Sequence, residues 1–77
     1  MNYTFDELNT LIKKMETYYS DDISGAVKVA LAPHYSMNHD QPIGYLVYKM
    51  MYGKDGTRGM YMTSYNFNEL NMMLEKN

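Results

Sequence analysis

The side chains best suited to chemistry lie in one short stretch, PHYSMNHDQP at residues 33–42. His34, His39 and Asp40 offer nitrogen and oxygen ligands and form a weak candidate metal loop. A structural zinc site needs four converging ligands, usually with paired short spacings, and the chain has no cysteine. Ser36 with His34 and Asp40 is too local to converge readily as a nucleophile triad. We therefore expect no metal, no cofactor and no catalysis.

The glycine-rich segment GKDGTRG, residues 53–59, raises the question of a phosphate-binding loop. Such loops lead from a strand into a helix, whose N-terminus holds the anion, and end in Lys-Ser or Lys-Thr. Here the segment joins two strand-like stretches and lacks that ending. The pair Asp55-Gly56 is instead typical of a hairpin turn, which leaves Lys54 and Arg58 as exposed cations near its tip.

Two helix starts follow one local pattern. In TFDEL at residues 4–8 and NFNEL at residues 66–70, a capping residue precedes a glutamate by three positions. That spacing predicts a capping box, in which each side chain bonds the other residue's backbone N–H. Apolar residues then recur every three or four positions. We predict helices from this first cap to about Ser20 and over about 67–76.

Between the helices, the sequence predicts strands at about 25–32, 43–52 and 60–64. Pro33 is expected to close the first strand, and residues 33–42 to form an ordered loop. The predicted fold class is α+β, with the order αβββα. A three-stranded antiparallel meander would carry both helices on one face. With 77 residues, the chain is expected to form a single domain, residues 1–77.

Strand 43–52 has apolar residues on both faces, so one face must meet solvent or a partner. Lys49 is its only charge, and we therefore place its odd positions outward, beside Ala30, Ala32 and the third strand. The predicted partner-binding residues are Lys28, Tyr45, Val47, Lys49, Met51, Lys54, Arg58, Tyr61 and Thr63. Removing the rings of Tyr45 and Tyr61 should then weaken binding without unfolding the protein. One alternative is that the loop at 33–42 folds over this face as a second small core.

The net charge of −2 is unevenly distributed. Residues 23–63 carry Lys28, Lys49, Lys54 and Arg58 against Asp40 and Asp55, so the expected sheet is mildly basic and the helices are acidic. A protein or ribonucleoprotein partner is the first expectation. The alternatives are a single-stranded or double-stranded nucleic acid on the Tyr/Lys face, and a homodimer that buries Tyr45 and Val47 against their copies.

The αβββα order resembles the double-stranded RNA-binding domain, whose second helix starts with a lysine cluster. At the matching place this chain has Glu69 and Glu75 and only one lysine, Lys76, so it lacks the cluster that binds phosphates in that family.

The capped helix at TFDEL, the strand VKVALA, the hairpin YLVYKMMYGKDGTRGMYM and the helix at NFNEL together resemble small phage-encoded inhibitors of bacterial defence, including anti-CRISPR proteins. That resemblance implies a non-enzymatic inhibitor of a host nuclease complex. No segment approaches about 18 consecutive apolar residues, and the N-terminus lacks the features of a signal peptide. We therefore expect no membrane association and a cytoplasmic location in a bacterial host.

Overall fold

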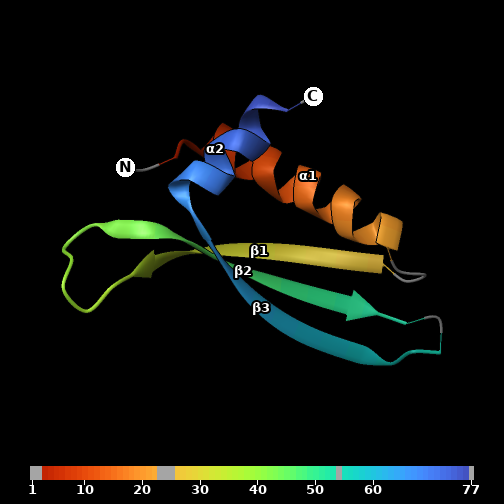
Figure 1. Ribbon diagram of the computed structural model, residues 1–77. Coiled ribbons are helices and arrows are strands. Elements are labelled where there is room, and N and C mark those ends of the chain that lie inside the picture. The colour runs from red at the N-terminus through yellow and green to blue at the C-terminus, as the bar shows by residue number, and fades with distance from the viewer. Residues whose placement is uncertain (1–2, 23–25, 54, 77) are drawn as a thin grey trace.

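A computed structural model describes residues 3–22, 26–53 and 55–76 of the chain. The order of its elements is α1 (Phe5–Asp22), β1 (Ala26–Tyr35), β2 (Pro42–Tyr52), β3 (Arg58–Asn66) and α2 (Phe67–Glu75). The three strands form one antiparallel sheet in the order β1-β2-β3 (Figure 1). This confirms the predicted α+β class and the αβββα order.

Both helices begin with the predicted capping boxes. At α1, the amide of Glu7 donates to Thr4 Oγ1 over 3.1 Å, and the Thr4 amide donates to Glu7 Oε1 over 2.9 Å. At α2, the Glu69 amide donates to Asn66 Oδ1 over 2.9 Å, and the Asn66 amide donates to Glu69 Oε1 over 3.4 Å. Amides that the helix itself cannot satisfy are thus bonded by side chains three residues away.

The turn of the β2–β3 hairpin lies at Asp55-Gly56, the pair from which it was predicted. Gly56 has a φ of +86°, a conformation that glycine adopts without steric cost. Asp55 Oδ1 accepts hydrogen bonds from the Thr57 amide and from Thr57 Oγ1, at 3.0 and 2.7 Å. These bonds hold the pKa of the Asp55 carboxyl below its usual value. The turn is therefore built by its own residues.

The first strand is longer than predicted, because it continues through Pro33 to Tyr35. A proline is tolerated on an edge strand when its nitrogen faces away from the neighbouring strand. Pro33 lies opposite Tyr45 in the register. It is an even number of residues from Val29, whose amide points away from β2 to the side chain of Glu16. The missing N–H of Pro33 therefore costs the sheet no hydrogen bond, and the prediction that Pro33 ends the strand was wrong.

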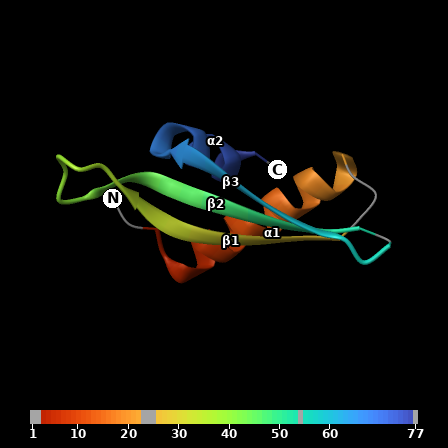
Figure 2. The ribbon, with the colours of Figure 1, turned by 90° about the horizontal axis from the view of Figure 1, so that it is seen from below.

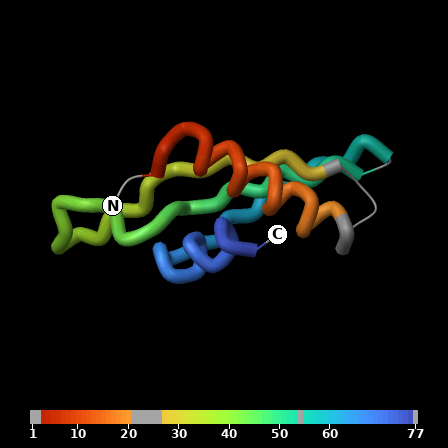
Figure 3. Tube along the Cα trace, turned by 90° about the horizontal axis from the view of Figure 1, so that it is seen from above, coloured from red at the N-terminus to blue at the C-terminus, as the bar shows by residue number. Residues whose placement is uncertain are grey.

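Both helices lie on one face of the sheet (Figures 1 and 3). Helix α1 packs against β1, and α2 packs against β2, β3 and α1. We call the helix-covered side the inner face and the opposite side the outer face. The buried core between helices and sheet consists of Leu11, Met15, Val27, Val29, Tyr45, Val47 and Leu70.

The predicted orientation of β2 was wrong. Tyr45 and Val47, placed outward from the sequence, are 5% and 0% exposed and lie under the helices. The register pairs Val29 with Lys49, and Lys49 with Tyr61, so the odd positions of all three strands share the inner face. Lys49 tolerates this side because its ammonium lies 4.1 Å from the centre of the Tyr19 ring. Because Tyr45 and Val47 are buried under the helices, they cannot form the contact of a homodimer, and that alternative is excluded.

The connection between β1 and β2 does not cover the sheet. It extends beyond the end of the sheet and away from the helices (Figures 1 and 2). Its Met37 is fully exposed. The His39 amide donates a hydrogen bond of 3.2 Å to the Ser36 carbonyl, which closes a local turn. The alternative of a second small core formed by this loop was therefore wrong.

Candidate protein-contact surface

In the part of the chain that the structure describes, no helix lies on the outer face of the sheet (Figure 2). By the strand register, it carries the even-numbered positions of each strand. Its principal residues are Lys28, Ala30 and Ala32 from β1, Leu46, Tyr48, Met50 and Tyr52 from β2, and Arg58, Met60, Met62 and Ser64 from β3. An antiparallel sheet with one solvated face normally shows polar residues there. Here most positions are apolar or aromatic.

Large side chains on this face are exposed. Met60, Met62 and Met50 are 66%, 58% and 39% exposed. The hydroxyl of Tyr52 contacts the sulfur of Met50 at 3.2 Å across the same face. The small side chain of Ala30 is also exposed beside these larger groups. An exposed apolar surface of this kind typically marks an interaction site, and methionine adapts its shape to different partners.

The charges on the outer face are positive and lie at one end. Lys28 is opposite Met50 in the register, and Arg58 is opposite Tyr52, two positions further along β2. Both side chains are exposed. The outer-face residues named above include no carboxylate. The surface therefore combines an apolar centre with a basic border near the β2–β3 hairpin.

The predicted partner-binding residues do not form one surface. Lys28 and Arg58 lie on the outer face, whereas Tyr45 and Val47 are buried. The remaining described members, Lys49, Met51, Tyr61 and Thr63, are on the inner face by register. Lys54 lies outside the described residues.

The outer-face residues missed from the sequence include the exposed Met50, Met60 and Met62 and the half-buried Tyr48. A signal for them was present. Val27, Val29 and Leu31 alternate in β1 and are typical of a buried face. The register joins them to the odd positions of β2, which leaves the even positions outward.

On the inner face, tyrosines link α1 to β3. The hydroxyls of Tyr19 and Tyr65 are 2.5 Å apart. Burial and this hydrogen bond raise the pKa of the Tyr19 hydroxyl far above its ordinary value. Tyr18 meets Tyr19 edge-on, with ring centres 5.3 Å apart. These contacts hold the C-terminal half of α1 to the sheet.

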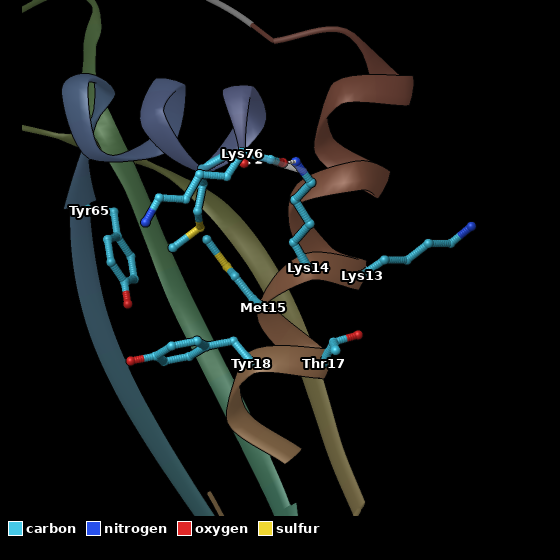
Figure 4. Close-up of a pocket in the computed structure, with 8 residues that line it drawn as sticks. Lys13, Lys14, Met15, Thr17, Tyr18, Tyr65 and Lys76 are labelled. Carbon is cyan, nitrogen blue, oxygen red and sulfur yellow. Dashed lines mark hydrogen bonds between the residues drawn. The ribbon is translucent and has the colours of Figure 1, made fainter. Parts of the chain in front are cut away.

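A groove of about 680 Å³ lies between α1, α2 and β3 (Figure 4). Met15, Tyr18, Tyr65 and Met73 contribute to its lining. Lys14 also lines this groove, and its ammonium is already hydrogen-bonded. Its Nζ donates to the carbonyls of Met73 and Leu74 at 2.8 and 3.2 Å and to that of Lys76. A cation on these last carbonyls stabilises the C-terminus of α2. In Figure 4, Lys13 points away from the groove.

The candidate metal loop is not assembled. Among the described residues, His34, His39 and Asp40 included, no group of three or more His, Cys, Asp or Glu side chains is arranged to hold a metal ion. In the same part of the chain, no helix is long and apolar enough to cross a membrane.

Comparison of the chain with protein-family models, with curated proteins and with solved structures found no match.

Proposed function

We propose that the chain is a small, non-enzymatic protein-binding module that contacts its partner with the outer face of the sheet. The observation that carries this proposal is that neither described helix covers the face on which the Met60, Met62 and Met50 side chains are substantially exposed. A module of 77 residues that leaves this much apolar surface open forgoes burial it could have used for its own stability. Contact with a partner accounts for that arrangement.

The charges favour one kind of partner. Lys28 and Arg58 border the apolar centre, so the complementary surface carries apolar side chains flanked by carboxylates. Rim charges of this type steer association and make its rate sensitive to salt. The resemblance to phage-encoded inhibitors makes a nuclease complex of a bacterial defence system the first partner to test.

A single-stranded nucleic acid is the second candidate for the same face. Tyr48 and Tyr52 share it with Lys28 and Arg58, and bases stack on aromatic rings while cations contact the backbone. Two cations are few for a nucleic-acid groove, and the two tyrosines are only partly exposed. The exposed side chains are mainly methionines, which favours a protein partner.

Affinity capture from a bacterial lysate, with and without nuclease, tests the proposal. The outer-face variant is Ala30→Glu, which adds volume and negative charge to an exposed position. The matched control is Lys13→Glu on the exposed side of α1. A specific partner should be retained by Lys13→Glu and by nuclease-treated samples.

With the purified partner, Ala30→Glu should weaken binding by about 2 kcal/mol or more, the loss typical of a hot-spot position. A partner lost on nuclease treatment would shift the proposal to nucleic acid. Binding that survives Ala30→Glu but not Lys13→Glu would overturn the outer face as the contact surface and move attention to the helix side.

A further inference from the structure

The two edges of the sheet differ. At the β1 edge, Glu16 of α1 accepts a hydrogen bond from the Val29 amide over 2.9 Å. A backbone group that could pair with another strand is thereby occupied, and a carboxylate is placed along that edge. Natural sheets prevent strand addition in this way, with charged side chains or a covering helix.

Among residues 3–22, 26–53 and 55–76, no side chain bonds the backbone of the β3 edge between Met60 and Ser64. The amide of Gly53 donates to the Thr57 carbonyl over 2.8 Å. In an antiparallel ladder, bonded pairs recur at every second position. Gly59, Tyr61 and Thr63 therefore use their backbone groups on β2, while Met60, Met62 and Ser64 direct theirs away from it. The bond from Val29 to Glu16 agrees with this alternation, because Val29 lies opposite Lys49, the partner of Tyr61.

The open stretch has a defined end. Asn66 is the next even position, and its amide is already bonded to Glu69 Oε1 in the capping box. Met60, Tyr61 and Met62 are 66%, 58% and 58% exposed, Ser64 is exposed, and Thr63 and Tyr65 are half-buried. An edge strand that is open, exposed and mostly apolar is a template for another strand.

We propose that the β3 edge pairs with the β3 edge of a second copy of this chain, antiparallel about a two-fold axis at Tyr61. Met60 of each copy then faces Met62 of the other, and their outward N–H and C=O groups form the interchain hydrogen bonds. The dimer is isologous, with the same surface contributed by both copies. This proposal goes beyond the proposed function and does not depend on it.

The strand is self-complementary in this register. Arg58 is its one charged residue and falls opposite Ser64 of the other copy, so no like charges meet. Antiparallel pairing also brings the Arg58 end of one strand beside the end of the other that leads into the acidic Glu69. On the inner face, the backbones of the two Tyr61 residues face each other at the axis, and each Tyr61 ring lies over Gly59 of its own strand. On the outer face, the methionines of both copies become continuous.

The test is the oligomeric state of the full chain by light scattering and analytical ultracentrifugation over a wide concentration range. The wild type should dimerise. Met62→Pro removes an N–H that the monomer does not use for β2, so the monomer keeps its fold, measured by circular dichroism. It should raise the dimer dissociation constant by about tenfold or more, since each copy loses a bond it donates. Ala30→Glu, on the outer face but remote from this edge, should remain dimeric.

Amide hydrogen exchange supplies a readout that needs no substitution. In the wild type, the Met60 and Met62 amides should become more protected as concentration rises, while the Tyr61 amide, which is bonded to β2, should not. A chain that is monomeric at every concentration would overturn the proposal. A dimer that is disrupted by Ala30→Glu, or that leaves exchange at Met60 and Met62 unchanged, would overturn it in favour of a face-to-face arrangement.

Discussion

Replacing Tyr45 by alanine should lower the free energy of unfolding by about 3–5 kcal/mol, as burial of a large aromatic side chain predicts. The Tyr45 ring is 5% exposed and lies between two other rings, with centre distances of 5.8 Å to Tyr3 and 6.3 Å to Phe67. A buried aromatic side chain removes about 200 Å² from water. At about 25 cal/mol per Å², this gives about 5 kcal/mol, and a compact unfolded state reduces it to about 3–4 kcal/mol.

Urea unfolding followed by circular dichroism measures this loss. A domain of this size has a total stability of about 4–12 kcal/mol, so Tyr45→Ala should remove a large part of it. Tyr45→Phe is the first control, because it keeps the ring and its contacts with Tyr3 and Phe67. Tyr48→Ala is the second, because Tyr48 is the next tyrosine on the same strand and lies on the outer face.

The ordering of the variants decides the result. Tyr45→Phe should stay within about 1 kcal/mol of the wild type, and Tyr48→Ala should cost clearly less than Tyr45→Ala. If Tyr48→Ala proved the more damaging change, or if Tyr45→Ala cost less than about 1 kcal/mol, the assignment of the inner and outer faces would be refuted. The same reversal would remove the basis for a contact surface on the outer face.

Lys14→Met should lower the free energy of unfolding by about 1–2 kcal/mol in a urea titration, because the ammonium bonds the carbonyls of Met73 and Leu74 at the end of α2. Its exposed neighbour provides the control Lys13→Met, which should change stability by less than about 0.5 kcal/mol; equal losses in the two variants would contradict a capping role. At alkaline pH, the raised pKa of Tyr19 means that folding favours the neutral hydroxyl. Its contribution to stability is therefore complete below the ordinary pKa of 10.0 and is lost as pH rises above it. Thermal unfolding between neutral and alkaline pH should show a shallower decline in Tyr19→Phe, and an unchanged decline would refute the role of this hydroxyl.

Features fixed by neighbouring residues were predictable from the sequence. The capping boxes need only residues three apart, and the turn needs only Asp55, Gly56 and Thr57, whose side-chain and backbone bonds are local. The order of elements follows from the positions of these helix caps and this turn, and from the spacing of the apolar residues between them. The fold class could therefore be predicted, and the predicted capping residues start both helices.

The candidate contact surface could not be predicted in the same way, because both faces of β2 are apolar. Which face is buried depends on long-range packing, in which Leu11, Met15 and Leu70 meet Tyr45 and Val47. The one charge on the strand suggested the opposite choice. Lys49 follows Tyr45 and Val47 onto the inner face, where its ammonium is accommodated by the ring of Tyr19, thirty positions earlier.

By itself, then, the sequence determined where helices and turns begin, since those choices depend on hydrogen bonds between near neighbours. The tertiary structure alone decided which sheet face is open and which edge is protected. Both depend on where α1 lies, because it buries the odd positions of the strands and brings Glu16 to the Val29 amide. In a strand that is apolar on both sides, the spacing of apolar residues does not show which face will be buried, because that depends on contacts with residues distant in the chain.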